Sequence, residues 1–163
     1  MLSLDASQRA YAAIQEKLAR GEPFLIAPQG TSMFPFLIAG RDKVLITPIA
    51  SQSRPRRGDI VLYRREEGLL VLHRMHHRSR EGYYFTGDNQ TVLEGPLERG
   101  QLLGIVTRIY RWDKDFSPSH PAFWIAGRLW LWVRPFRPII SKRAKKILKA
   151  LHLYKETGTN HHD

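Results

Sequence analysis

The sequence predicts a mostly β fold with an N-terminal helix and a C-terminal basic, amphipathic helical segment. Three observations support this prediction. Apolar residues recur at helical spacing near the N-terminus, short apolar runs fill the middle of the chain, and basic residues mixed with tryptophan follow Trp112. At 163 residues the chain has room for one hydrophobic core. We divide it into a helix over 1–22, a β domain over 23–112 and a C-terminal segment over 113–163.

The first predicted element is an amphipathic helix over residues 5–20. Tyr11, Ile14 and Leu18 fall on one face of such a helix, and Gly21 follows it as a stop signal. We expect this helix to pack against the rest of the protein through that face.

The middle of the chain contains short runs of apolar or alternating residues, which are typical of β-strands. Glycine, asparagine and aspartate fall between the runs and favour turns. The predicted strands cover residues 24–27, 43–47, 59–63, 69–75, 83–86 and 102–109.

The C-terminal segment is strongly basic. Residues 124–155 contain nine basic side chains, no acidic one and three of the four tryptophans. Two interpretations remain open: a peripheral contact of residues 124–155 with a membrane, or a helical hairpin that packs on the β domain and leaves a basic face in water. Arginine and proline interrupt the apolar residues of 122–140, so a membrane-spanning helix is not expected.

The overall composition narrows the classes of function. The net charge of +11 indicates an anionic partner surface, and the absence of cysteine excludes disulfides, thiolate zinc sites and a cysteine nucleophile. The first residues lack the basic and apolar regions of a secretion signal, so we expect a cytoplasmic or peripherally membrane-associated protein. Nothing in the sequence indicates an oligomeric state.

The segment from Gly30 to Pro35 has residues suited to chemistry. Gly30 frees the backbone and Pro35 fixes it, so Ser32 lies in a rigid turn where its hydroxyl can face a carbonyl group. Three further segments follow in the order Arg57-Gly58-Asp59-Ile60-Val61-Leu62-Tyr63, Val71-Leu72-His73-Arg74-Met75 and Phe85-Thr86-Gly87-Asp88-Asn89-Gln90.

Together these four segments resemble the signal peptidases of the S24/S26 serine peptidase group. The resemblance covers residues 24–110 and implies a mostly β domain with its active site at the edge of a curled sheet. Where bacterial leader peptidases carry a lysine base, this chain has His73, as in the endoplasmic-reticulum and archaeal branch. The resemblance therefore implies Ser32 as the nucleophile and His73 as the general base.

A histidine base needs an acceptor that holds its working tautomer, and two carboxylates are candidates. Glu94 resembles the position of the orienting aspartate in the histidine branch, and Asp88 lies in the Gly-Asp-Asn turn itself. Met33 and Thr31 are candidate substrate-binding residues because they flank Ser32. An ordinary imidazole pKa near ~6.5 lets a histidine accept the serine proton near neutral pH.

No metal ion or other cofactor is expected. His73, His76 and His77 lie close together in the sequence, but His73 and His76 would face opposite sides of a strand and no carboxylate has a zinc-ligand spacing. Lys43 lies before the segment in which related repressor-cleaving enzymes carry a lysine base.

The expected function is that of a serine endopeptidase that removes a leader or signal segment from a precursor protein or peptide through an acyl-enzyme on Ser32. The alternative is a non-catalytic binding module of the same fold that uses its basic C-terminal segment on lipid or nucleic acid. Residues 1–21 offer one helix, too few for a helix-turn-helix, so nucleic acid is not the expected partner.

Overall fold

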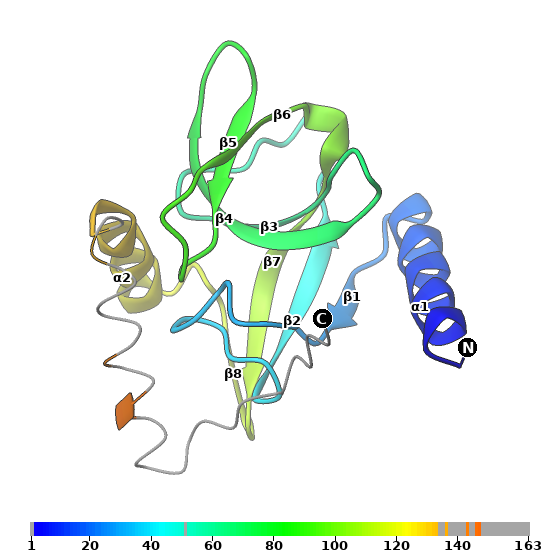
Figure 1. The fold of residues 1–163 in the computed structure, drawn as a ribbon, viewed down its shortest axis with the longest axis horizontal. Helices are drawn as coiled ribbons and strands as arrows, with labels where there is room; N and C mark the ends of the chain where they lie inside the picture. The colour runs from blue at the N-terminus through cyan, green and yellow to red at the C-terminus, as the bar shows by residue number, and fades with distance from the viewer. Residues whose placement is uncertain (1, 51, 134–135, 137–142, 144–145, 148–163) are drawn as a thin grey trace, which may run out of the picture.

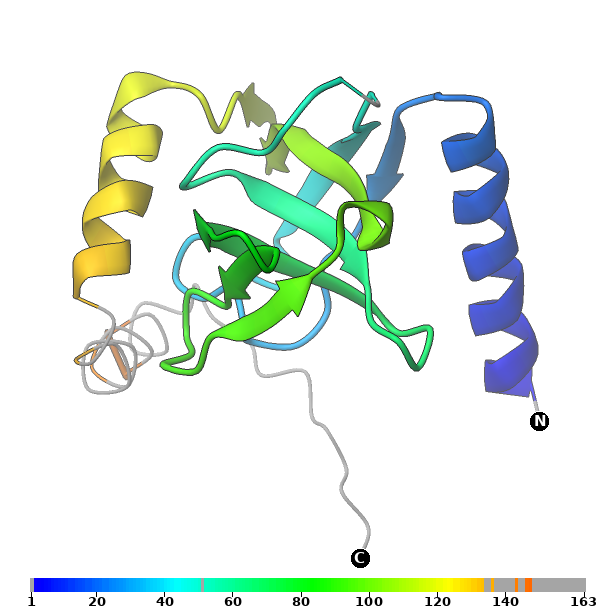
Figure 2. The same ribbon diagram turned by 90° about the horizontal axis from the view of Figure 1, so that it is seen from above.

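A sheet of eight antiparallel strands forms the body of the molecule, and a helix lies on either side of it (Figures 1 and 2). The computed structural model describes residues 2–50, 52–133, 136, 143 and 146–147. The elements are, in chain order, α1 (Leu2–Ala19), β1 (Phe24–Ile26), β2 (Asp42–Pro48), β3 (Ile60–Arg64), β4 (Leu70–Arg78), β5 (Tyr83–Thr86), β6 (Glu94–Leu97), the short 3₁₀ helix η1 (Arg99–Gln101), β7 (Leu102–Arg111), β8 (Lys114–Phe116) and α2 (Pro121–Trp132).

The strands lie in the order β1-β2-β7-β3-β4-β5-β6, and β8 pairs with β7. β3 occupies a central position, which explains why four of its five residues are buried. Successive side chains of a strand point to opposite faces. Ile60 and Leu62 therefore enter one core cluster, while Val61 and Tyr63 enter the other.

The two core clusters cover opposite faces of the sheet. Ile14 and Leu18 of α1 and Phe123 of α2 pack against the cluster that contains Ile60 and Leu62. The face of α1 that carries Ile14 and Leu18 therefore packs against the sheet, as the helical spacing of these residues predicts. The cluster around Tyr63 is formed by side chains of β3, β4, β5, β6 and β7.

The mostly β prediction is confirmed, as are a helix at the N-terminal side and one at the C-terminal side. The prediction that the sheet is curled is wrong. The sheet is open: among the described residues its end strands, β1 and β6, each pair with a single neighbour and not with each other. These end strands have three and four residues, so they offer few backbone groups for a closing pairing.

All six predicted strands are present, but the sequence did not predict β6 or β8. Of the basic segment predicted over 124–155, the structure describes residues 124–133 and the single positions 136, 143, 146 and 147. The rest of that prediction lies outside the described residues. In the described part of the chain, no helix is long and apolar enough to cross a membrane.

Candidate active site

Ser32 lies in a turn of the loop that joins β1 to β2. The turn begins at Gly30, whose φ of 70° is a left-handed conformation that glycine adopts without strain. The backbone N–H of Phe34 donates to the carbonyl of Thr31, at 3.1 Å, and closes the turn. Ser32 is half-buried and Thr31 is exposed. Ser32 therefore lies in a hydrogen-bonded turn.

The Ser32 turn contacts the Gly87-Asp88-Asn89 turn that follows β5. The N–H of Asn89 donates to the carbonyl of Ser32 at 2.7 Å. A Cβ atom on Gly87 would lie 2.7 Å from the same carbonyl oxygen, so only glycine allows this approach. Two of the sequence motifs, far apart along the chain, are thus in direct contact.

Ser32 also lines a cavity of about 410 Å³. Met33, a candidate substrate-binding residue, lines the same cavity and is buried in the core, whereas Thr31 is not part of the lining. The remaining lining is mostly apolar and comes from α1, β1, β3, β4 and the loop after β1: Ile14, Ile26, Ala27, Pro28, Gln29, Leu62, Leu70, Val71 and Leu72. Ser32 therefore lies beside the part of β4 that directly precedes His73.

His73 is buried on β4, opposite Val61 of β3. Its Nδ1 atom lies 2.9 Å from the hydroxyl oxygen of Tyr63. That hydroxyl donates its proton to Oε2 of Glu94, at 2.7 Å, because an ionised carboxylate can only accept. The Tyr63 oxygen is then free to accept from Nδ1–H of His73. This order of donors assigns the proton of the neutral ring to Nδ1 and leaves Nε2 as the basic nitrogen.

Glu94 is held in place by Arg65. The Nε and Nη2 atoms of Arg65 donate to the two carboxylate oxygens at 2.5 and 2.7 Å, a bidentate pair. Burial opposes ionisation of Glu94, but the hydrogen bonds from Arg65 and Tyr63 outweigh it and lower the pKa of the carboxyl group below its ordinary value. Glu94 is therefore a charged acceptor at neutral pH.

Burial lowers the pKa of His73 to about 4, and the charge of Glu94 opposes this shift only in part. The Oε2 atom of Glu94 is 3.7 Å from Nδ1, with the Tyr63 hydroxyl bonded to both residues. The ring is thus neutral at a lower pH than the sequence-based expectation of ~6.5 implies.

Asp88, the other candidate for orienting His73, has a different partner. Both of its carboxylate oxygens accept hydrogen bonds from Arg74, at 2.8 and 2.7 Å, and both residues are buried. Arg74 also donates to the carbonyl of Gly58, and Trp130 of α2 donates to the Asp88 carbonyl at 2.6 Å. Of the two carboxylates, only Glu94 is connected to His73 by hydrogen bonds among the described residues.

The described hydrogen bonds do not include one between the Ser32 hydroxyl and the His73 ring. Such bonds are often long in an enzyme without substrate and shorten when substrate binds. The structure thus brings together Glu94, Tyr63 and His73 on one side, and Ser32 with the Gly87-Asp88-Asn89 turn on the other.

Tyr63 and Arg65 are the residues that the sequence analysis missed. Val61 of β3 is the cross-strand partner of His73, so period-2 alternation places Tyr63 on the face of His73, and Arg65 directly follows the end of β3. A buried tyrosine also requires a partner for its hydroxyl. These two signals are present in the sequence.

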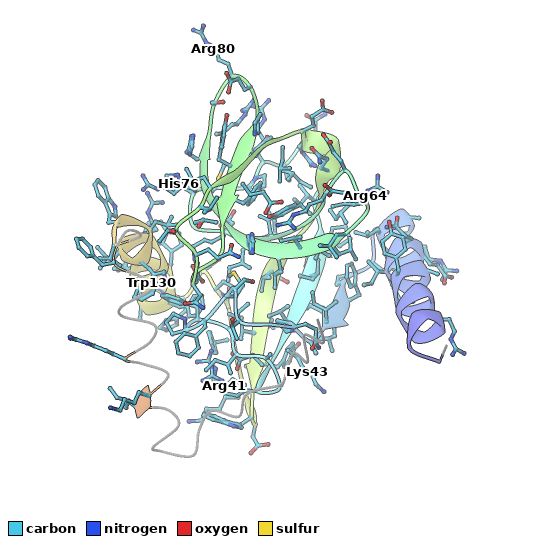
Figure 3. All side chains as sticks on the ribbon, viewed as in Figure 1. Arg41, Lys43, Arg64, His76, Arg80 and Trp130 are labelled. Atoms are coloured by element: carbon cyan, nitrogen blue, oxygen red, sulfur yellow. The ribbon has the colours of Figure 1, made fainter. Side chains whose placement is uncertain are left out.

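The structure also shows where the residues considered for a lysine base and a metal site lie. Lys43 is exposed on β2 and lies well apart from His76 on β4 (Figure 3). A bulge between Met75 and His77 brings the rings of His76 and His77 together, with 2.8 Å between their Nδ1 atoms. No three metal-ligating side chains gather among the residues described.

In comparisons with known proteins, no protein-family model matches the chain, and no curated protein matches it.

Proposed function

We propose that this protein is a serine endopeptidase of the signal-peptidase type, which removes a leader or signal segment from a precursor. The observation that carries the proposal is the set of hydrogen bonds from Arg65 through Glu94 and Tyr63 to Nδ1 of His73. A buried histidine needs a hydrogen-bond partner in any role, but a general base also needs one tautomer and a fixed ring, which these hydrogen bonds supply.

In the proposed reaction the Oγ atom of Ser32 attacks the carbonyl carbon of the scissile peptide bond, while Nε2 of His73 accepts the hydroxyl proton. The tetrahedral oxyanion accepts a hydrogen bond from the N–H of Ser32. Its collapse breaks the C–N bond, and His73 returns the proton to the leaving amine. Water then attacks the acyl-enzyme, with His73 again as the base, and releases the acid and free Ser32.

Two further features support this assignment. Glu94 compensates the imidazolium that forms when His73 accepts the proton, and the Tyr63 hydroxyl transmits this stabilisation through hydrogen bonds. The mostly apolar cavity at Ser32 suits small apolar side chains next to the scissile bond. The sheet is not curled as the resemblance implies, so the proposal rests on the candidate site and on the mostly β fold alone.

Covalent labelling followed by peptide cleavage tests the proposal. A fluorophosphonate should add one adduct to the wild-type chain, located on Ser32 by tandem mass spectrometry, and none to Ser32→Ala. The wild type should also cleave members of a random peptide library, while Ser32→Ala and His73→Ala should not. The matched control is Ser119→Ala, which removes an exposed hydroxyl between β8 and α2 and should leave both readouts unchanged.

Two results would reject the proposal that this protein is a serine endopeptidase. One is library cleavage by Ser32→Ala at the wild-type rate. The other is a folded wild-type chain that neither reacts with the probe nor cleaves any peptide, which would favour the non-catalytic binding module.

A further inference from the structure

Helix α2 is apolar on all sides, although the described residues cover only one side of it. Arg128 is the single charged residue among its twelve. Gly127 and Leu131 are buried, Phe123 packs on the core, and Trp130 points toward the sheet (Figure 3). These four residues form the inner face of α2. A helix that is apolar all round is normally buried on all sides.

The outer face of α2 consists of Ile125, Leu129 and Trp132. Their side chains are 49, 61 and 74% exposed. Their spacing of four and three residues places them on one stripe, and at 100° per residue this stripe lies opposite the inner face. Phe136, 62% exposed, follows four residues later. A contiguous exposed apolar surface of this kind marks an interaction site.

Arginine side chains border the outer face. The guanidinium of Arg57 lies 5.6 Å from the Trp132 ring centroid, and that of Arg128 lies 4.5 Å from the ring of Trp124. The α2 sequence has no acidic residue, and none occurs between Trp124 and Lys155, where nine basic residues are present. The partner must therefore combine negative charge with an apolar interior.

We propose that the outer face of α2 is a docking surface for an anionic phospholipid bilayer. Aliphatic side chains and tryptophan enter the boundary between headgroups and acyl chains, while arginine contacts the phosphates. A nucleic acid would satisfy the arginines but leave Ile125 and Leu129 without an apolar partner. A second copy of the chain would bring Arg57 and Arg128 of two molecules together, and like charges repel.

The contacts of the inner face of α2 determine where a bilayer on the outer face would lie relative to the candidate active site. Trp130 donates to the carbonyl of Asp88, and a Cβ atom on Gly127 would lie 2.6 Å from Arg74 Nη1. Asp88 precedes Asn89, which bonds the Ser32 carbonyl. A bilayer on the outer face would thus lie across one helix from the turn that holds Ser32. The docking surface itself does not depend on the proposed peptidase activity.

Vesicle sedimentation of the full chain tests this proposal. The probes are vesicles of phosphatidylcholine alone and vesicles in which part of it is replaced by phosphatidylglycerol. The wild type should bind the anionic vesicles at low salt at least about tenfold more tightly than the neutral ones, and high salt should weaken this binding. Ser32→Ala should bind as the wild type does, which separates docking from catalysis.

The variant Leu129→Ser with Trp132→Ser removes the apolar stripe without touching the core, and it should bind at least about tenfold more weakly. Its matched control is Leu69→Ser, since Leu69 is 56% exposed on the turn between β3 and β4. Circular dichroism verifies that both variants are folded. The proposal is overturned if the wild-type protein does not sediment with anionic vesicles at low salt. It is also overturned if Leu129→Ser/Trp132→Ser binds the vesicles as tightly as Leu69→Ser does. Loss of a dimer in Leu129→Ser/Trp132→Ser, without vesicle binding by the wild type, would instead assign the face to a second copy.

Discussion

Two arginine–carboxylate pairs flank the candidate active site, and they use the same geometry for different purposes. In each, Nε and Nη2 of an arginine donate to both oxygens of a carboxylate. The Arg74–Asp88 pair is buried beneath α2. The Arg65–Glu94 pair is partly exposed and borders a cavity of about 670 Å³.

The difference lies in what else each carboxylate contacts. The Asp88 side chain has no described hydrogen-bond partner besides Arg74, whose guanidinium also lies 4.8 Å from the ring centroid of Phe36. Glu94 keeps a contact with the Tyr63 hydroxyl and, through it, with His73. The first pair fastens strand β4 to the turn after β5, and the second acts on a titratable ring. Closeness in sequence to a histidine therefore does not decide which carboxylate serves it.

The largest expected effect concerns stability. Asp88→Asn leaves the buried charge of Arg74 without a counter-ion and should lower the free energy of unfolding by about 3–5 kcal/mol. Glu94→Gln affects a partly exposed pair and should cost no more than about 1 kcal/mol. Urea unfolding at pH 7 measures both, with Asp115→Asn, in the exposed pair with Arg108, as the control. Equal losses for Asp88→Asn and Glu94→Gln would remove the distinction between the two pairs.

The next effect is the pH dependence that His73 gives to stability. Its pKa is about 4 in the folded protein, below the ordinary value of 6.5, so between these values the unfolded chain binds more protons. The free energy of unfolding therefore falls as the pH falls, by about 2 kcal/mol between pH 7 and pH 5. His73→Asn should lack this share of the slope in a series of urea titrations.

The pKa of His73 also distinguishes the effects of the two carboxylates, Glu94 and Asp88. Because the charge of Glu94 raises the pKa of His73 more than that of Asp88 does, Glu94→Gln should lower that pKa further. Nuclear magnetic resonance of the His73 ring measures the shift. A His73 pKa above 6.5 in the wild type would mean that Glu94 contacts the ring directly, without Tyr63 between them.

The smallest expected effect belongs to Tyr63→Phe. Phenylalanine keeps the stacking on Phe85, with centroids 4.9 Å apart, but removes the acceptor of Nδ1–H. One lost hydrogen bond of about 1 kcal/mol should lower kcat/KM on a cleaved peptide by roughly fivefold. The ¹⁵N shifts of His73 should report a mixture of tautomers. Tyr83→Phe, in the same core cluster, should change neither quantity.

Strand prediction succeeded where burial follows the sequence pattern and failed where another constraint prevailed. β6 contains Gly95 and Pro96, which favour turns, and proline is tolerated in it because β6 is an end strand of the sheet. β8 has only three residues, Lys114–Phe116, of which the first two are charged, and it follows Trp112, whose φ is 51°. Neither strand has an apolar pattern that could be seen in the sequence.

The candidate site was predictable in part. The motifs around Ser32 and Asn89 were expected to belong to one site, and the structure places them in contact. The choice between Asp88 and Glu94 depends on which arginine faces each carboxylate, and sequence spacing does not contain that information. The alternation along β3 predicts that Tyr63 is buried, and the need of its hydroxyl for a partner is the signal that points to the site.

The contact of α2 with Arg74 and Asp88 also bears on how the chain matures during its synthesis. A nascent chain that ends after β8 already contains every strand that the structure describes, but not the helix that covers this ion pair. Until Gly127 and Trp130 have left the ribosome, water can reach both charges, and the Asp88 carbonyl lacks its indole donor. Domains fold in the order in which they are made. The turn that bonds Ser32 therefore gains its final support only after α2 has been made.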